Sequence, residues 1–237
     1  MDYVDKKLLM SAAENFGVEI NAEQAEKFEG YARLLFEWNQ KMNLTAITSP
    51  EGVALLHFAD SLTLLSAADF KEGASLADVG TGAGFPSVPL AIMRPDMQFT
   101  LVDSLNKRIT FLEAVKSELG LDFKTVHGRA EELGRDAKYR EKFDFATARA
   151  VAGLNVLCEY CLPFVKKGGS FLAMKGPSGQ EEAAQAENAV KLLGGRLSAV
   201  KEFSLGENDR RVIIIDKIFP ISQKYPRQSG KIKKSPL

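Results

Sequence analysis

The chain has 237 residues, of which 45% are hydrophobic and 26% charged, as in an ordinary globular protein of one large domain or a domain with an accessory segment. No apolar run approaches the roughly 20 residues that cross a bilayer, and the first residues carry acids where a signal peptide has its apolar core. Two cysteines form no disulfide framework, so we expect a cytoplasmic protein.

The 31 basic and 31 acidic residues balance, but they are unevenly distributed along the chain. Residues 1–72 carry 12 acids and 6 bases, whereas residues 220–237 carry five bases and no acid. A basic tail on a neutral chain suggests a polyanionic partner. The alternative is a solvated, disordered tail, because such a composition offers little to bury.

The first 72 residues have the pattern of a helical cap. Asn21 followed by Gln24 is a capping box, and apolar residues from Phe28 to Trp38 recur at helical spacing. Ser49-Pro50 predicts another helix start, because proline suits the first helical position. No strand pattern interrupts these helices, so we expect an N-terminal helical cap over residues 1–72.

From Ser75 onward, short apolar runs alternate with segments of helical period. The runs expected to form strands are "SLADV" (75–79), "QFTLVD" (98–103), "FKTVH" (123–127), "FDFATA" (143–148) and "SFLAMK" (170–175). This alternation predicts a parallel sheet with right-handed crossovers. Two final runs, 195–205 and 210–219, are too close for a crossover helix and predict an antiparallel hairpin. The expected fold is α/β and Rossmann-like, with a seven-stranded, mostly parallel sheet over residues 73–219 and a basic tail over 220–237.

The turn after the first strand, "DVGTGAGFP" (78–86), carries three glycines in five positions. The dinucleotide fingerprint would need its third glycine where Phe85 stands, so a pyrophosphate binder is not the first expectation. In an open α/β sheet the ligand lies beyond the carboxyl ends of the strands, where Asp103 suits an adenosyl ribose. Asp78 beside the turn favours the cationic S-adenosylmethionine over NAD. An NAD-dependent oxidoreductase remains the alternative.

Seven blocks along the chain carry a more specific signal: "WNQKMNLTAI" (38–47), "HFADSL" (57–62), "DVGTGAGFPSVPLAI" (78–92), "GRAEEL" (128–133), "ARAVAGL" (148–154), "MKG" (174–176) and "YPRQSGKIKKSPL" (225–237). Together they resemble the bacterial small-subunit (16S) rRNA guanine-N7 methyltransferases, the family of methyltransferase G, once called glucose-inhibited division protein B. The resemblance implies a class I methyltransferase that uses S-adenosylmethionine and modifies a guanine in a hairpin loop near the decoding site.

The resemblance also implies where the methyl donor binds. It points to Gly80, Phe85, the Asp103 region, the pair Ala130 and Glu131, and Arg149. Together with the rest of the glycine turn, the expected cofactor-binding residues are Asp78, Gly80, Gly82, Gly84, Phe85, Asp103, Ser104, Leu105, Ala130, Glu131 and Arg149. The backbone at residue 130 with Glu131 can frame an adenine edge, and Arg149 ends a strand that points into the cleft.

The fourth strand bears on the acceptor atom. Its end, "FDFATARAV", lacks the D/N-P-P-Y pattern that holds exocyclic amines. Cys158 and Cys161 come too late, inside a predicted helix, to attack a pyrimidine C5, and core packing is favoured for them over a redox pair or half a zinc site. Guanine N7 carries a lone pair and no proton, so alignment with the donor is the main demand and no catalytic side chain is expected. Transfer to a ribose 2′-hydroxyl remains open, and no metal is expected.

Basic residues in the second half of the chain suggest contacts with RNA. The expected substrate-side residues are His57, Lys175, Arg210, Arg211, Lys217, Tyr225, Arg227, Lys231, Lys233 and Lys234. Tyr225 beside Pro226-Arg227 interleaves an aromatic ring with charge, as RNA contacts often do. For His57, helix packing is the alternative. We expect a monomer that binds 16S rRNA or the small ribosomal subunit; a ribosome-assembly module that holds the donor without chemistry is a further alternative.

Overall fold

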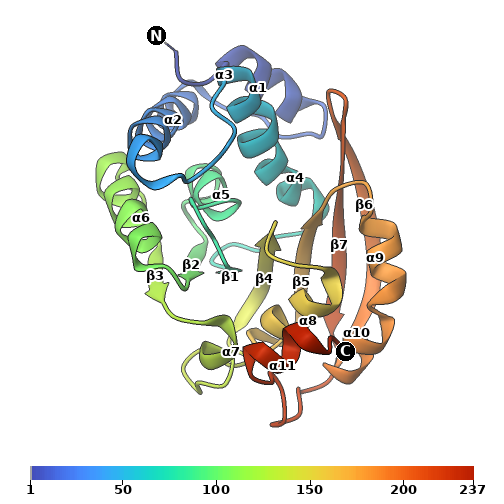
Figure 1. Ribbon diagram of the computed structural model, residues 1–237. Coiled ribbons are helices and arrows are strands. Elements are labelled where there is room, and N and C mark those ends of the chain that lie inside the picture. The colour runs from blue at the N-terminus through green and yellow to red at the C-terminus, as the bar shows by residue number, and fades with distance from the viewer. Residues whose placement is uncertain (1) are drawn as a thin grey trace.

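The computed structural model describes residues 2–237, which form one seven-stranded sheet with helices on both faces (Figure 1). The order across the sheet is β3-β2-β1-β4-β5-β7-β6. The strands are β1 (Ser75–Val79), β2 (Gln98–Asp103), β3 (Lys124–His127), β4 (Phe143–Arg149), β5 (Val165–Lys175), β6 (Gly195–Leu205) and β7 (Asn208–Lys217). Strands β1 to β5 run parallel, and β7 pairs antiparallel with both β5 and β6. The predicted Rossmann-like sheet with its terminal hairpin is confirmed.

The N-terminal segment is helical, and its helix starts follow the local signals in the sequence. It contains α1 (Lys6–Glu14), α2 (Ala22–Met42), α3 (Pro50–Gly52), the π-helix η1 (Val53–Ala59) and α4 (Asp60–Ala67). Asn21 and Gln24 form the reciprocal capping box at the start of α2, and the Ser49 hydroxyl accepts from the Gly52 amide before α3. The π-helix was not predicted; such wide turns often lie at functional sites.

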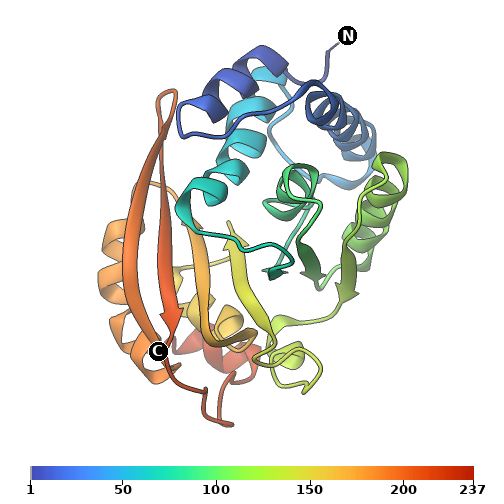
Figure 2. The same cartoon turned by 180° about the vertical axis from the view of Figure 1, so that it is seen from behind.

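These helices cover one face of the sheet together with α5 (Ser87–Met93) and α6 (Asn106–Leu119) (Figure 2). Buried side chains of the N-terminal segment, such as Phe28 and Phe58, belong to the same hydrophobic cluster as Leu76 of β1 and Phe99 of β2. The Tyr31 hydroxyl also donates to the Ala83 carbonyl in the glycine turn. The expected cap over residues 1–72 therefore reaches the sheet through η1 and α4, whereas α2 packs on α5 and α6.

The opposite face carries α7 (Ala130–Leu133), α8 (Leu154–Cys161), α9 (Gly179–Gln185), α10 (Glu187–Leu192) and α11 (Ser229–Lys234). Their cluster includes Ala77 and Val79 of β1, which alternate with Leu76 across the sheet. Cys158 and Cys161 are fully buried in this cluster, and burial raises the pKa of both thiols. Core packing thus explains the "CEYC" stretch.

The basic tail is folded rather than solvated. Ile221, Tyr225 and Ile232 of this segment are buried against α8 and its neighbours. The guanidinium of Arg140 holds it by donating to the carbonyl oxygens of Ile221, Ser222 and Tyr225 at 2.9 to 3.2 Å. The tail thereby brings α11 alongside α8 (Figure 1).

Candidate active site

A cleft of about 670 Å³ lies at the carboxyl ends of β1, β2 and β4. Its volume falls within the range of about 300–1,000 Å³ usual for small-molecule sites. One end is bordered by Leu44, Thr45 and His57 of the N-terminal segment, and the other by Ser229 and Lys233 of α11. The floor is the glycine-rich turn, as expected for an open α/β sheet.

The three glycines of the turn serve different purposes. Gly80 and Gly82 line the cleft with positive φ of 76° and 63°, a conformation that glycine adopts without strain. A Cβ at Gly82 would meet no heavy atom closer than 4.0 Å, so this position is open towards a ligand. Gly84 is not among the residues that line the cleft. It is packed inside the fold, where an added Cβ would stand 2.5 Å from the Val88 side chain. Its expected donor contact is corrected to a packing role.

Asp78 also differs from the expectation. Its side chain is fully buried beneath the turn, where one oxygen accepts from the Thr81 hydroxyl at 2.8 Å and the Ser87 amide at 3.4 Å. Alternation along β1 turns this residue to the face covered by α5, away from the cleft. Burial raises the pKa of the Asp78 carboxyl to about 7. Asp78 therefore supports the turn and the start of α5 instead of meeting the donor.

Asp103 lines the cleft at the end of β2, but its carboxylate is already engaged. One oxygen accepts from the Gly82 amide at 3.0 Å and from Arg108 at 3.1 Å, and the other accepts from the Leu105 amide at 2.9 Å. A carboxylate offers about four acceptor positions, so about one remains for a ribose hydroxyl. Ser104 lines the cleft, whereas the Leu105 side chain is exposed outside it and contributes only its amide.

Ala130 and Glu131 lie beside Asp103, at the start of α7, and both line the cleft. Gly128 and Arg129 precede them in the lining. Glu131 is mostly buried, and with Gly128, Arg129 and Ala130 it forms one continuous run of chain along the cleft.

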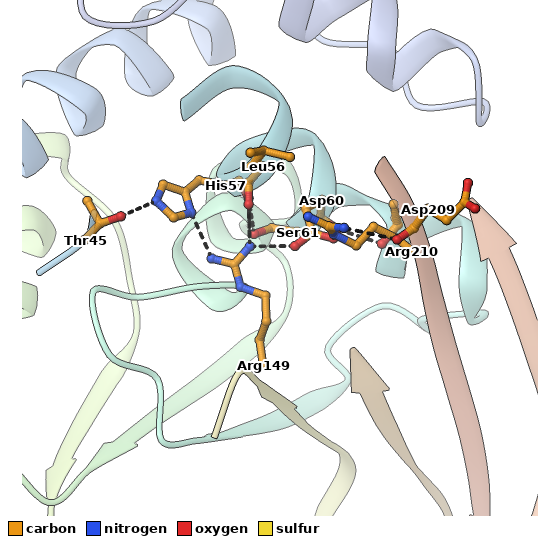
Figure 3. A network of polar contacts seen from close by, with 9 residues as sticks. Thr45, Leu56, His57, Asp60, Ser61, Arg149, Asp209 and Arg210 are labelled. Carbon is orange, nitrogen blue, oxygen red and sulfur yellow. Dashed lines mark hydrogen bonds and ion pairs between the residues drawn. The ribbon is translucent and has the colours of Figure 1, made fainter. Parts of the chain in front are cut away.

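Arg149 organises the other end (Figure 3). From the end of β4 its guanidinium donates to Asp60 Oδ2 at 2.8 Å, to the Leu56 carbonyl at 3.1 Å and to His57 Nδ1 at 3.2 Å. It also lies over the Phe85 ring, 4.7 Å from the centroid. Arg210 of β7 adds a second cation to Asp60, with Nε 3.2 Å from Oδ1. Asp60, the first residue of α4, thus links this helix to β4 through Arg149 and to β7 through Arg210.

His57 lies between these groups and is uncharged. Its ring stacks on Phe85 with centroids 4.4 Å apart, and its Nε2 is 2.7 Å from the Thr45 hydroxyl oxygen. Burial, and secondarily the charge of Arg149, lower the pKa of His57 to about 3. The His57 ring is buried, as helix packing requires, and it also borders the cleft, as a substrate-side role requires.

The structure separates the lysines and arginines expected on the RNA side into two groups. Those already bound within the protein are Lys175 with Glu182, Arg210 with Asp60, Arg211 with Glu202, Lys217 with Glu141, and Arg227 with Glu159. Those exposed on α11 are Lys231, Lys233 and Lys234, for which no ion pair is found within residues 2–237. Only Lys233 of these three lines the cleft.

Two assignments to RNA are corrected outright. Lys217 is 1% exposed, its ammonium donates to the Leu162 carbonyl at 2.9 Å, and burial lowers the pKa of this lysine to about 8. Tyr225 is 4% exposed and belongs to the hydrophobic cluster under the tail. Neither side chain can reach RNA, because packing and local partners hold both inside the fold.

Several residues that face the cleft were missed from the sequence. Thr45 and Arg108 line it, and Asp60 holds Arg149 in place. Arg108 had a weak signal, since a cation in the first turn of a helix that starts beside Asp103 can reach back to that acid. Within the described residues 2–237, no group of three or more His, Cys, Asp or Glu is arranged to hold a metal ion, and no helix has the length and apolar character to cross a membrane.

Comparisons with known proteins agree with this geometry. The family model described as GidB, rRNA small subunit methyltransferase G, matches residues 24–213. The chain is 52% identical over 224 residues to ribosomal RNA small subunit methyltransferase G of Staphylococcus epidermidis, covering 93% of each chain. It is 51% identical over 235 residues to the protein of that name from Acetivibrio thermocellus, covering 98% of this chain and 96% of that one.

A solved structure shares the fold at low identity. A mutant of the 16S rRNA (adenine(1408)-N(1))-methyltransferase from Catenulisporales acidiphilia superposes with a TM-score of 0.52 at 16% identity, over 64% of this chain and 88% of that chain. Because the family model spans most of the sequence and relatives about half identical align over nearly their whole length, the chain belongs to the family of ribosomal RNA small subunit methyltransferase G.

Proposed function

We propose that this protein transfers the methyl group of S-adenosylmethionine to N7 of a guanine in 16S rRNA of the small ribosomal subunit. Membership of the family supports the reaction and the RNA. The choice of N7 rests on one observation at the Arg149 end of the cleft: both ring nitrogens of His57 are occupied, by Arg149 and by Thr45. His57 therefore has no free lone pair with which to accept a proton from a substrate.

The remaining carboxylates are also poorly placed for a proton transfer at that end. Asp60 is buried and neutralised by two arginines, and Asp78 lies beneath the turn. Within the described cleft lining, Asp103 and Glu131 are the carboxylates, and both stand at the end suited to adenosine. An exocyclic amine or a hydroxyl would need a base, whereas N7 has no proton to lose.

The cleft fits S-adenosylmethionine. Gly82 offers open space at a positive φ, Asp103 has about one acceptor position left, and Glu131 faces the same volume. When bound, S-adenosylmethionine supplies a methyl group on a sulfonium cation. Arg149 does not oppose that cation strongly, because Asp60 compensates its charge and His57 is neutral. The residues of the turn, Asp103 and Arg149 thus serve to bind and orient the reactants.

The decisive experiment is mass mapping of methylated nucleotides in rRNA from cells with and without this protein. We expect one 7-methylguanosine of 16S rRNA to disappear with the gene and to reappear when purified protein and S-adenosylmethionine are added to small subunits. A methyl group on another atom, or none, would refute the proposal. Calorimetry with NAD and with S-adenosylmethionine tests the oxidoreductase alternative, which requires that NAD bind. An assay for multiple turnover on small subunits distinguishes an enzyme from a binding module.

The cellular setting is part of this proposal. An enzyme that acts on ribosomal RNA in bacteria works in the cytoplasm, and residues of one chain line the cleft from the N-terminal segment to α11. We therefore propose a cytoplasmic monomer. Sedimentation at working concentration with and without small subunits tests this directly.

A further inference from the structure

The hydrogen-bond network at the Arg149 end determines the protonation of His57. A guanidinium can only donate, so His57 Nδ1, 3.2 Å from Arg149 Nη2, must be the acceptor. A neutral imidazole carries its single proton on the other nitrogen. His57 Nε2 therefore donates to the Thr45 hydroxyl oxygen at 2.7 Å (Figure 3).

The same oxygen receives a second donor. The Ile47 backbone amide donates to Thr45 Oγ1 at 3.0 Å, so both acceptor positions of this hydroxyl are filled. Its own proton must then point elsewhere, and within residues 2–237 no acceptor is found for it. The Thr45 hydroxyl is consequently a donor without a partner in the protein.

Thr45 is also held rigidly. Its amide donates to Asn39 Oδ1 at 2.9 Å, and its carbonyl accepts from Asn39 Nδ2 at 3.0 Å. With the His57 and Ile47 contacts, four hydrogen bonds fix one residue of the loop that follows α2. Thr45 lines the cleft with Leu44 and His57, and its loop after α2 lies on the opposite side of the strand ends from α7 and α11 (Figure 1).

We propose that the Thr45 hydroxyl donates a hydrogen bond to the carbonyl oxygen O6 of the target guanine and thereby selects guanine over adenine. The assignment rests on the proposed function, because it places the base at the end of the cleft that adenosine does not need. Guanine presents the acceptors N7 and O6 side by side, whereas adenine presents an amino group at position 6. A donor fixed beside N7 suits guanine and meets a second donor in adenine, which a rigid site rejects.

The contact acts on binding more than on the chemical step. Methylation at N7 makes the base cationic, which weakens O6 as an acceptor in the transition state. Loss of the contact should therefore raise KM for the small subunit while kcat stays close to its normal value. The loss of one hydrogen bond corresponds to an increase of about tenfold at most.

The test combines a change in the protein with a change in the base. Small subunits are reconstituted with guanine or with 2-aminopurine at the target position; 2-aminopurine keeps N7 and lacks O6. The protein variants are Thr45→Val, which removes the hydroxyl, and Thr45→Ser, which keeps it. Thr48→Val is the matched control, because Thr48 is an exposed threonine of the same loop that does not line the cleft.

We expect 2-aminopurine to raise KM about severalfold to tenfold for the unchanged protein, for Thr45→Ser and for Thr48→Val. Thr45→Val should show the higher KM already on guanine and no further increase on 2-aminopurine. Equal KM values of the unchanged protein on the two bases would overturn the proposal, and this comparison does not depend on the folding of any variant. The proposal would also be overturned if Thr45→Val raised KM, relative to the unchanged protein, by the same factor on guanine and on 2-aminopurine. A methyl group mapped to an atom other than N7 would instead refute the proposed function.

Discussion

Arg227 of the C-terminal segment and Glu159 of α8 form a two-point ion pair: Nη2 lies 2.6 Å from Oε2, and Nε lies 2.9 Å from Oε1. The Arg227 amide also donates to the same carboxylate at 2.7 Å, and Glu159 is fully buried. The two residues are 68 positions apart in the sequence. Arg227 was expected to contact RNA, because it lies in the basic tail beside Tyr225. Its actual role is to fasten α11 at one border of the cleft.

Removing one partner of this pair should be costly. In Glu159→Gln the guanidinium keeps its charge without a counterion, and loss of one member of a buried pair costs about 3–5 kcal/mol of unfolding free energy. We expect a lower Tm and earlier proteolytic cleavage within residues 220–237. Thermal unfolding and limited proteolysis measure both.

The pair of Arg211 and Glu202, in which the carboxylate is exposed, provides the matched control. Glu202 is 67% exposed, so Glu202→Gln should change the unfolding free energy by less than about 1 kcal/mol. If Glu159→Gln were no more destabilising than Glu202→Gln, the pair would not be what fastens the tail.

Asp103 should determine donor affinity. Replacement by Ala removes the acceptor that faces the cleft and also the bond that holds the Gly82 amide. One hydrogen bond to a charged acceptor contributes about 1.5–3 kcal/mol, so S-adenosylmethionine should bind at least about tenfold more weakly. Calorimetry on folded Asp103→Ala protein measures this, and unchanged affinity would rule out the ribose contact.

The rate of methyl transfer should depend little on pH. His57 stays neutral at any pH well above its pKa of about 3, and N7 releases no proton. Single-turnover rates on small subunits saturated with donor should therefore be nearly flat between about pH 6.5 and 8.5. A tenfold rise per pH unit in that interval would require a general base and another acceptor atom.

Stability should respond to pH below neutrality. Because the pKa of His57 is about 3 in the folded protein and 6.5 in the unfolded chain, the unfolded chain binds an extra proton between these values. The neutral His57 therefore contributes roughly 3–6 kcal/mol to the unfolding free energy above pH 6.5, and this contribution is lost as the pH falls towards 3. The raised pKa of Asp78, about 7, has the opposite slope, so the total change is smaller.

Comparison with a variant isolates the histidine. His57→Gln cannot take up the proton, so the difference in unfolding free energy between the two proteins should shrink as the pH falls from 6.5 to 4. Urea unfolding at several pH values measures it. A difference that stays constant over this interval would show that His57 has an ordinary pKa in the fold.

The three lysines of α11 should account for part of the salt dependence of RNA binding. Lys231, Lys233 and Lys234 are exposed, and each phosphate contact contributes roughly 0.7–0.9 to the slope of log K against log salt. Replacing all three by Gln should flatten the slope by about two to three units if all contact phosphate. Lys7, Lys71 and Lys191, three exposed lysines outside the cleft lining, form the control set. An unchanged slope with an intact fold would leave α11 without a role in RNA binding.

The sheet could be predicted because its signals are local. Each strand is a short apolar run, the capping box of Asn21 and Gln24 lies within four residues, and the hairpin follows from the distance between β6 and β7. The positions of glycines 80 and 82 and of Asp103 followed from strand ends for the same reason.

The roles of charged residues could not be predicted, because they depend on distant partners. Lys217 and Arg227 pair with Glu141 and Glu159, which precede them by dozens of residues. Asp78 was misassigned because only the packing of α5 decides which way its side chain points. Thr45 gave no signal at all, since its free proton depends on a tautomer of His57 that Arg149, 92 residues later, imposes.

The cleft is bordered at one end by the loop around Thr45 and at the other by α11, two segments that lie far apart in the sequence. Each border is held by contacts between segments remote in sequence, and such non-local contacts form slowly. Either border can also detach while the sheet persists, since local openings need less free energy than global unfolding. In mild denaturant, donor binding should therefore vanish while the circular dichroism of the backbone is still that of the native protein.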